Sequence, residues 1–267
     1  MVDAFEAVSF LTRSENRVDV LESLAGGAHT ERELVADTGI TDVTVGRVLE
    51  DFTERGWVVE TGDGYRRTRL GDMLAEDYAR FEDSMDLACR LGPVRDLLPL
   101  EELPFDLRLL GEGLVSDPET FDTLGAVDHW KRLIRQSDRV VGTATAGTAT
   151  TVVAEPFHHE IVERGTEFEV VVSQAYYEAA RSDPESRRLA REVLEAGAEY
   201  YLAEDIAEFT TQVANFDDIA TVSGYDEAGN IRVGIETRAK PVHEWVQSVY
   251  DEHRENARRL TPEDFAE

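Results

Sequence analysis

The sequence is poor in cysteine and in long apolar stretches, and each shortage excludes a class of protein. Its 267 residues include one cysteine, Cys89, so no intrachain disulfide can form and a cysteine-rich zinc site is excluded. The longest uncharged stretch, residues 140–154, is too short to cross a bilayer. No N-terminal segment resembles a signal peptide. We therefore expect a cytoplasmic protein that does not enter a membrane.

Cations are scarce as well. The chain has 27 Lys+Arg against 56 Asp+Glu, a net charge of −29, and two of its cations are lysines, Lys131 and Lys240. A charge of this sign repels nucleic acid in dilute salt. Acid-rich, lysine-poor sequences are typical of salt-accumulating halophiles, where roughly 1 M salt shortens the Debye length to about 3 Å. On that interpretation net charge does not exclude DNA; the alternative is an acidic protein from a low-salt organism.

The length predicts one or two domains, and an apolar fraction of 42% is too high for a disordered chain. We predict an α/β protein in three segments. Residues 1–75 form a winged helix-turn-helix DNA-binding domain, residues 76–104 a helix and linker, and residues 105–267 a mixed, mostly parallel α/β effector domain.

The first segment has the pattern of a winged helix-turn-helix. Residues 4–24 are predicted to be helical, and Thr30 with Glu33 forms a capping box at the start of the next helix. Apolar residues spaced i, i+3, i+4 and i+7 from Val45 to Phe52 predict the buried face of a third helix. A short hairpin then follows. The predicted wing strands are residues 57–59 and 65–70.

In this motif the third helix enters the major groove, with its N-terminal residues nearest the bases. Arg47 is the best candidate for bidentate reading of guanine, and Thr44 for a methyl or phosphate contact. Residues 41–70 hold five arginines against six acidic residues, so this stretch is nearly neutral. An interaction module whose arginines only balance the acidic surface is the alternative. The predicted DNA-binding residues are Thr41, Asp42, Val43, Thr44, Arg47, Arg66, Arg67 and Arg69.

Two parts of the sequence resemble known regulators. Residues 14–18 and 41–57 resemble archaeal winged-helix transcriptional regulators of the halophile type. Four later stretches resemble the effector domain of the methanogenesis and filamentation regulators: residues 105–110, 117–118, 138–140 and 241–254. The resemblance implies a DNA-binding regulator whose second domain senses a signal or mediates association. Residues 117–120 and the threonine-rich run 143–151 depart from the family pattern, so the ligand stays open.

From residue 105 onward, strand and helix patterns alternate and end in a hairpin, which predicts a mixed, mostly parallel sheet. A helix over residues 71–91 is expected either to pair with its twofold mate or to pack on its own domain. The expected strands are residues 107–110, 139–145, 168–173, 200–203, 212–214, 219–225 and 231–236, with a loop at 226–230 joining the last two. The expected helices are residues 121–136, 151–164, 176–181, 184–196 and 241–260.

Polar residues follow two of the predicted strands, at the edge where the ligands of parallel sheets bind. The amides of residues 144–148 precede a helix and could hold an anion; a capped turn is the alternative. The predicted ligand-binding residues are Thr143, Thr145, Thr148, Ser173, Gln174 and Tyr176.

The sequence has no P-loop, no Gly-x-Gly-x-x-Gly and no Gly-x-Ser-x-Gly. His158 and His159 with Glu155 or Glu160 could bind a metal, but adjacent histidines face different directions on a helix, which favours a surface pair. We expect no enzyme, no cofactor and no metal. The sequence predicts a homodimeric transcriptional regulator that binds double-stranded DNA and possesses a small-molecule effector site. A protein-binding adaptor, or a metal- or phosphate-dependent enzyme, is the alternative.

Overall fold

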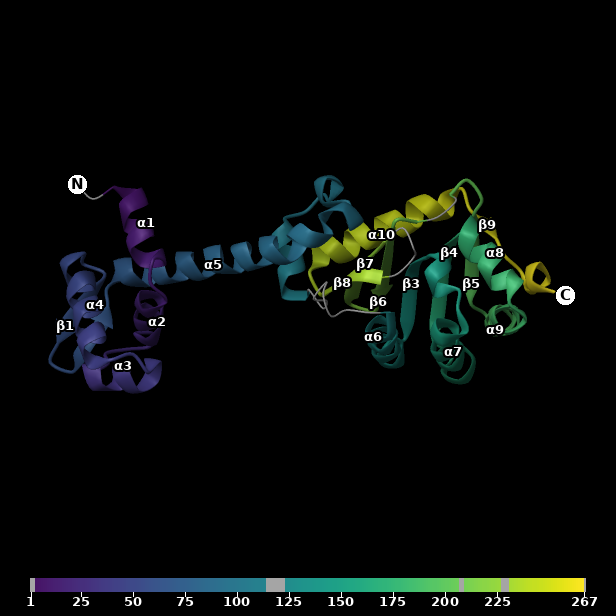
Figure 1. The fold of residues 1–267 in the computed structure, drawn as a ribbon. Coiled ribbons are helices and arrows are strands. Elements are labelled where there is room, and N and C mark those ends of the chain that lie inside the picture. The colour runs from purple at the N-terminus through teal and green to yellow at the C-terminus, as the bar shows by residue number, and fades with distance from the viewer. Residues whose placement is uncertain (1–2, 114–122, 207–208, 227–230, 267) are drawn as a thin grey trace. The chain divides into compact units, whose positions relative to one another are not determined.

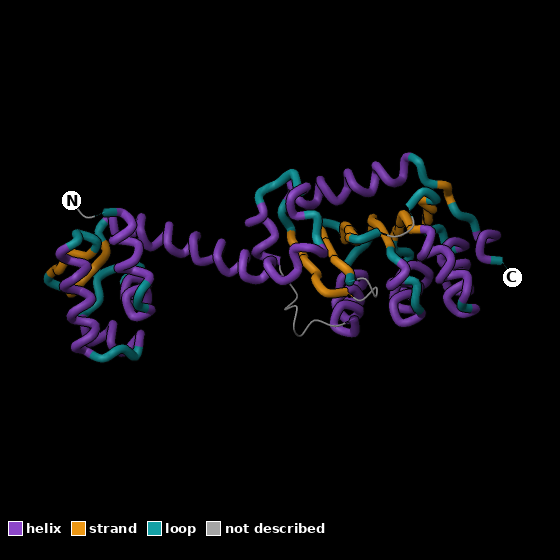
Figure 2. The backbone as a smooth tube through the Cα atoms, turned by 45° about the horizontal axis from the view of Figure 1, so that its top comes forward, coloured by secondary structure: helices purple, strands orange, loops and turns teal. Residues whose placement is uncertain are grey.

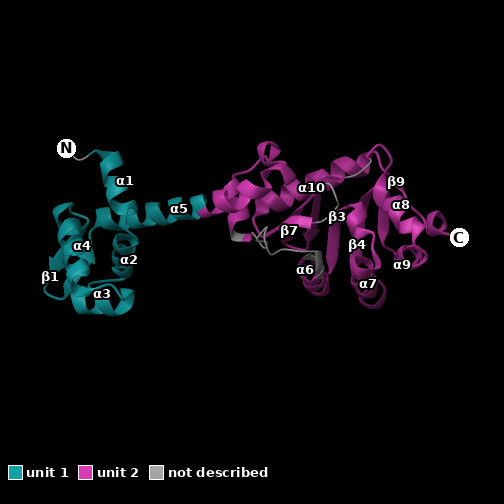
Figure 3. Ribbon diagram, viewed as in Figure 1, with its two compact units in different colours: residues 1–85 teal, residues 86–267 magenta. Residues whose placement is uncertain are grey.

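The computed structural model describes residues 3–113, 123–206, 209–226 and 231–266. These form two compact units, Met1–Met85 and Asp86–Glu267 (Figure 3). Helix α5 (Arg69–Leu91) begins in the first unit and ends in the second. No helix among the described residues is long and apolar enough to span a bilayer.

The first unit consists of helices followed by an antiparallel hairpin (Figure 1). The continuous helix predicted over residues 4–24 is two helices, because Ser14 adopts an extended backbone and begins a second helix. The elements in order are α1 (Ala4–Thr12), α2 (Glu15–Ser23), α3 (Glu31–Thr38), α4 (Asp42–Glu54), β1 (Val58–Thr61) and β2 (Gly64–Arg67).

Helix α3 begins and ends where the sequence places its signals. The predicted capping box is confirmed: the Glu33 amide donates to Thr30 Oγ1 at 3.3 Å, and the Thr30 amide donates to the Glu33 carboxylate at 2.8 Å. Gly39 ends the helix with a φ of 71°, in the left-handed region that glycine adopts without strain. Two residues after Gly39, Thr41 is the N-cap of the next helix, α4.

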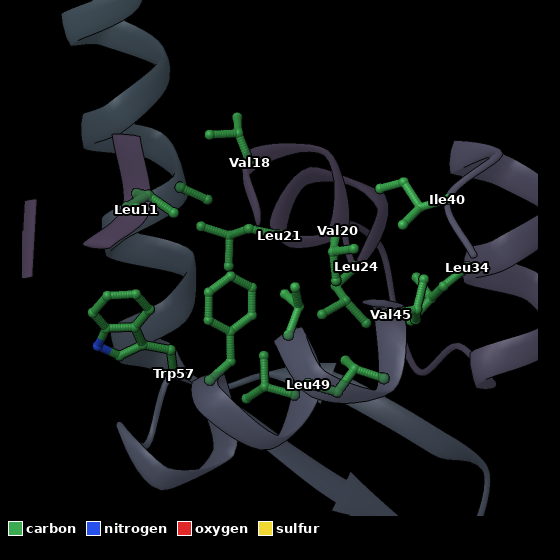
Figure 4. Close-up of a cluster of buried hydrophobic side chains, with 14 residues drawn as sticks. Leu11, Val18, Val20, Leu21, Leu24, Leu34, Ile40, Val45, Leu49 and Trp57 are labelled. Carbon is green, nitrogen blue, oxygen red and sulfur yellow. The ribbon is translucent and has the colours of Figure 1, made fainter. Parts of the chain in front are cut away.

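One apolar core holds the helices and the hairpin of the first unit together. Val45, Val48, Leu49 and Phe52 of α4 are all buried, as their spacing predicts. Figure 4 shows side chains from α2, α3 and α4 converging on this core beside Trp57. Because this whole face of α4 is used in packing, the opposite face is left to the solvent.

The second unit is built on one seven-stranded sheet in the order β8-β7-β6-β3-β4-β5-β9. The predicted mixed α/β architecture is confirmed, but the prediction that the sheet is mostly parallel is wrong. The pairs β3-β4 and β4-β5 are parallel, and the other four pairs are antiparallel. Parallel pairs need long crossovers, and the helical crossovers stop after β5. The strands are β3 (Arg139–Ala144), β4 (Glu167–Ser173), β5 (Glu199–Ala203), β6 (Thr211–Phe216), β7 (Ile219–Tyr225), β8 (Ile231–Thr237) and β9 (Arg258–Arg259).

Helices cover both faces of this sheet (Figures 1 and 2). Helix α10 (Lys240–Glu255) lies on one face, with Val242 and Val246 in a shared cluster with strands β6 to β8. The other face carries α6 (Thr123–Gln136), α7 (Thr151–His159), α8 (Gln174–Ser182) and α9 (Pro184–Glu195). The space between this second helical layer and the sheet contains the pocket described below.

Residues that join α5 to the sheet form short helical turns rather than a strand. The strand predicted over residues 107–110 is wrong: it is the 3-10 helix η3 (Leu107–Gly113), with Leu110 buried among β7 and β8 and the Leu109 carbonyl accepting from Thr237 Oγ1 at 3.0 Å. Residues 117–118 of the resemblance, the start of the helix predicted over 121–136, and most of the loop 226–230 lie outside the described residues. The remaining turns are η1 (Gly92–Leu97), η2 (Leu100–Glu102), η4 (Ala146–Thr148), η5 (Glu160–Arg164) and η6 (Pro262–Phe265).

Candidate DNA-binding surface and ligand pocket

The solvent-facing side of α4 carries the residues predicted to meet DNA. Val43 is 78% exposed, and Arg47, one turn later, is exposed on the same side. Thr41 and Asp42 are exposed at the helix start, where the Thr41 hydroxyl lies 2.9 Å from that of the half-buried Thr44. An exposed apolar side chain beside a guanidinium suits contact with a thymine methyl next to a guanine.

Arg47 and Arg66 have charges that nothing in the described part of the chain neutralises. Arg47 forms no ion pair or side-chain hydrogen bond with the described residues, and Arg66 on β2 contacts only the Arg67 carbonyl, at 3.5 Å. By contrast, Arg17 and Arg55 both lie within 4 Å of Asp51, at 3.9 and 3.8 Å. Two cations without a carboxylate partner in the described residues therefore lie on α4 and on the hairpin.

Two of the predicted wing arginines are not exposed, unpaired residues of the hairpin: Arg67 is paired with a carboxylate, and Arg69 belongs to α5. The Arg67 side chain is 14% exposed, and its Nε lies 3.2 Å from Asp72 of α5. Arg69 is the first residue of α5, because strand β2 ends at Arg67 and not at residue 70. Thr68 explains the early end: its Oγ1 donates to the Gly56 carbonyl at 2.7 Å and accepts from the Gly71 amide at 3.2 Å, which starts the helix.

The hairpin is fastened to the segment before α3. His29 and Tyr65 exchange two backbone hydrogen bonds, each 2.8 Å long. Gly64 makes this approach possible, since it has a φ of 117° and a Cβ there would lie 2.4 Å from the His29 carbonyl oxygen. The wing is thus positioned by the same unit that positions α4.

In the second unit, a cavity lies between the sheet and helices α7, α8 and α9. Of the six predicted ligand residues, Thr143, Thr148 and Tyr176 line it, whereas Thr145, Ser173 and Gln174 do not. Ser173 is fully buried and accepts from the Tyr176 amide at 3.0 Å, so it begins α8 as its N-cap. Gln174 donates to Glu178 at 2.9 Å on the surface.

The turn predicted to hold an anion uses one of its amides, that of Thr148, internally, and the amide of the next residue is used in the same way. The Thr148 amide donates to the Thr145 carbonyl at 2.9 Å and the Ala149 amide to the Ala146 carbonyl at 3.1 Å. No lysine or arginine is among the described residues that line the cavity. These contacts do not favour an anion site, and neither Thr145 before η4 nor Thr150 before α7 caps its helix with its side chain.

The pocket walls are mainly apolar, and they include five aromatic side chains that the sequence did not point to. The missed side chains are Trp130, Phe157, Phe168, Tyr200 and Phe216. In the sequence they occur at ordinary core positions of strands and amphipathic helices, and only the topology brings them to one cavity. Burial raises the pKa of Tyr176 to about 12 and that of Tyr200 well above its ordinary value, so both phenols stay neutral.

The histidine pair of α7 forms no metal site in the described residues. His158 Nε2 lies 2.7 Å from a Glu192 carboxylate oxygen. No group of three or more histidine, cysteine, aspartate or glutamate side chains in the described ranges is arranged to hold a metal ion.

The two units define a winged-helix protein with a C-terminal α/β body. Residues 5–90 match the HVO_A0261 N-terminal domain, and residues 124–256 match the middle domain of the methanogenesis regulatory protein FilR1. The chain is therefore a regulator of the archaeal winged-helix type with a methanogenesis-regulator middle domain. No curated protein matches the sequence.

Solved structures with some likeness to the chain are remote. TrmBL2, described as an archaeal chromatin protein with a novel mode of DNA binding, is 13% identical with a TM-score of 0.42, covering 91% of this chain and 92% of that chain. An O-methyltransferase family protein from Burkholderia thailandensis is 13% identical with a TM-score of 0.21, covering 76% and 80%.

Proposed function

We propose that this regulator binds double-stranded operator DNA in the cytoplasm through α4 and the wing of the first unit. The observation that carries the proposal is the solvent face of α4, where an exposed Val43 and an uncompensated Arg47 lie one turn apart while the opposite face forms the core. This arrangement can present a cation and a methyl-contacting side chain to base edges.

We further propose that two copies associate through α5. Four large apolar side chains on this helix are about half exposed: Leu70 at 57%, Met73 at 50%, Phe81 at 53% and Met85 at 48%. At 100° per residue these positions fall within roughly one third of the helix circumference, so they form one stripe. Burying such a stripe against a second copy removes it from water. The dimer would present two recognition helices to half-sites about 34 Å, or a multiple of it, apart.

The role of the second unit completes the proposal. Its cavity gives a small molecule a place to bind, and binding there would alter the affinity of the dimer for its operator. A ligand can shift such an equilibrium only as far as it prefers one state over the other. The sign of the effect, activation or repression, is decided by which state the ligand prefers.

Selection of bound sequences from a random DNA pool, followed by fluorescence anisotropy from 0.2 to 2 M KCl, tests DNA binding. We expect an enriched motif that still binds above 1 M salt, because phosphate contacts weaken with salt and base contacts then supply much of the affinity. Recovery of no motif would overturn the proposal. Capture of a specific protein in place of DNA would point to the adaptor function.

Sedimentation velocity tests the dimer. Phe81→Glu places a charge within the apolar stripe and should shift the protein from dimer to monomer. Ala79→Glu is the matched control, because Ala79 is exposed on the side of α5 opposite the stripe. A Phe81→Glu variant that sediments as a dimer would exclude α5 as the interface.

A further inference from the structure

The walls of the cavity in the second unit are mainly apolar and combine aliphatic side chains with aromatic rings. It lies against β3, β4 and β6 and beneath α7 to α9, with an empty volume of about 840 Å³ that includes its open mouth. Four pairs of its rings, among Phe157, Phe168, Tyr176, Tyr200 and Phe216, have centroids 5.7 to 6.4 Å apart. Rings at such spacings pack against one another, and the edges and faces that they leave toward the cavity can contact an apolar ligand.

The cavity contains no uncompensated charge among its described lining residues. Glu169 lines it, but its carboxylate accepts from Tyr250 of α10 at 2.9 Å and from Arg139 at 2.8 Å. Helix α10 covers the opposite face of the sheet, so this carboxylate is directed away from the cavity. Apart from the two buried tyrosines, which stay neutral, the other ionisable lining side chain is His158, which pairs with the Glu192 carboxylate. An anion would find no cation here, and a cation would find no free carboxylate.

Several polar side chains of the wall have partners within the protein. Tyr176 and Tyr200 are both buried, and their ring centroids lie 6.3 Å apart. Thr148 Oγ1 donates to the Thr145 carbonyl at 2.7 Å, and the Gln212 side-chain oxygen accepts from the Tyr225 hydroxyl at 2.5 Å. A ligand therefore gains mainly from burying apolar surface and from contact with the rings.

We propose that this cavity binds an uncharged, planar aromatic molecule. The assignment rests on the sensor role proposed above and narrows it to one ligand class. It differs from the anion predicted from the threonine-rich turn, because the wall offers rings and no positive charge.

Two dyes with the same ring system separate charge from shape. N-phenyl-1-naphthylamine is uncharged, and 8-anilino-1-naphthalenesulfonate adds one sulfonate to it. We expect saturable fluorescence enhancement of the uncharged dye on the full-length protein at one site per chain, with the sulfonate bound at least tenfold more weakly at 1 M KCl. Equal affinities would overturn the proposal, as would tighter binding of the sulfonate.

Substitutions in α7 test where the dye binds. Ala154→Phe fills the cavity from a half-buried lining position, and Val152→Phe adds the same ring at a 52% exposed site of the same helix that does not line the cavity. We expect a tenfold or greater loss of dye affinity for the first and none for the second, with unchanged circular dichroism in both. Equal effects of the two substitutions would place the dye elsewhere and overturn the assignment.

Phe168→Leu tests the aromatic part of the assignment, since it keeps an apolar side chain and removes one ring. Dye affinity should fall several-fold, whereas unchanged affinity would overturn the preference for aromatic ligands. Operator affinity measured with and without dye separates this proposal from the sensor role. Dye binding that leaves operator affinity unchanged supports the ligand class and refutes the sensor role. Failure of the uncharged dye to bind a protein that still binds operator refutes the ligand class.

Discussion

Replacing Arg47 with alanine tests whether α4 reads bases. Arg47 is exposed and has no side-chain partner among the described residues, so its loss breaks nothing within the first unit. We expect the free energy of unfolding to change by less than about 0.5 kcal/mol, as at other exposed sites. The affinity for operator DNA, in contrast, should fall, because the exposed Arg47 side chain can no longer contact a base.

The magnitude follows from the geometry that α4 offers. A guanidinium that bonds two acceptors of one guanine is worth about 1–3 kcal/mol of discrimination against the wrong base. This corresponds to roughly a 5- to 150-fold weaker Kd for the selected operator. Binding to unrelated DNA should weaken much less. The slope of log K against log salt should stay nearly constant, because a base contact neutralises no phosphate.

Fluorescence anisotropy at 1 M KCl measures these quantities. Arg13→Ala is the matched control, because Arg13 is an exposed arginine at the end of α1 and its loss changes the net charge equally. Arg66→Ala should instead lower the salt slope by about one, as expected for a phosphate contact from the wing. If Arg47→Ala and Arg13→Ala weaken operator binding equally, Arg47 acts only as a charge, and the base-reading assignment is refuted.

Three further results are expected. Gly64→Ala should destabilise the first unit by about 3–5 kcal/mol, because alanine is strained in the left-handed region and the two hydrogen bonds to His29 are lost. Gly62→Ala is the control and should cost under about 1 kcal/mol, because a Cβ at that position contacts no other atom. Hydrogen exchange of the core amides of α4 measures both free energies, and similar values would contradict the steric reasoning. Tyr250→Phe should lower the free energy of unfolding, measured with urea, by about 1.5–3 kcal/mol, because Tyr250 is 2% exposed and donates to a carboxylate. A smaller loss than for the same substitution at an exposed tyrosine would contradict this prediction. Burial opposes ionisation of Glu169, but hydrogen bonds from Arg139 and Tyr250 outweigh it and lower the pKa of the carboxyl. The stability that this carboxylate contributes is present above pH 4.5 and is lost as pH falls through the lowered pKa. The free energy of unfolding of Glu169→Gln should therefore fall less steeply than that of the wild type between about pH 5 and 3.

The local signals of the first unit predicted α3 and α4, but not the break at Ser14 that divides the predicted helix 4–24 into α1 and α2. The capping box at Thr30 and the apolar spacing from Val45 to Phe52 act within a few residues, and both are confirmed. The wing was predicted three residues too long, because Thr68 uses its hydroxyl to start α5 and so ends β2. Such competition between a strand and a helix start depends on the Gly56 carbonyl, which lies twelve residues away.

Long-range features were predicted less well. Leu107 to Leu110 have the composition of a strand, but they form helical turns in the cluster shared with β7 and β8, and the Leu109 carbonyl accepts from Thr237 Oγ1. Similarly, Phe157 on α7 and Phe216 on β6 face one cavity although 59 residues separate them in the sequence. The spacing of apolar residues in the sequence predicts that each of these side chains is buried. It does not predict which buried side chains line a cavity.

The net charge of −29 becomes informative once the arginines are followed to their partners. In the described part of the first unit, Arg17, Arg55, Arg67 and Arg80 have a carboxylate within 4 Å, and the arginines without one are Arg13, Arg32, Arg47, Arg66 and Arg69. In a chain with 56 acidic residues, a guanidinium that stays unpaired keeps its charge available for an external anion. Three of these five, Arg47, Arg66 and Arg69, belong to the predicted DNA-binding set. High salt screens the repulsion between DNA and the remaining acidic surface at distances beyond about 3 Å. Contacts made by Arg47 at the base edge lie within that distance, so we expect specific binding to survive the salt that abolishes non-specific binding.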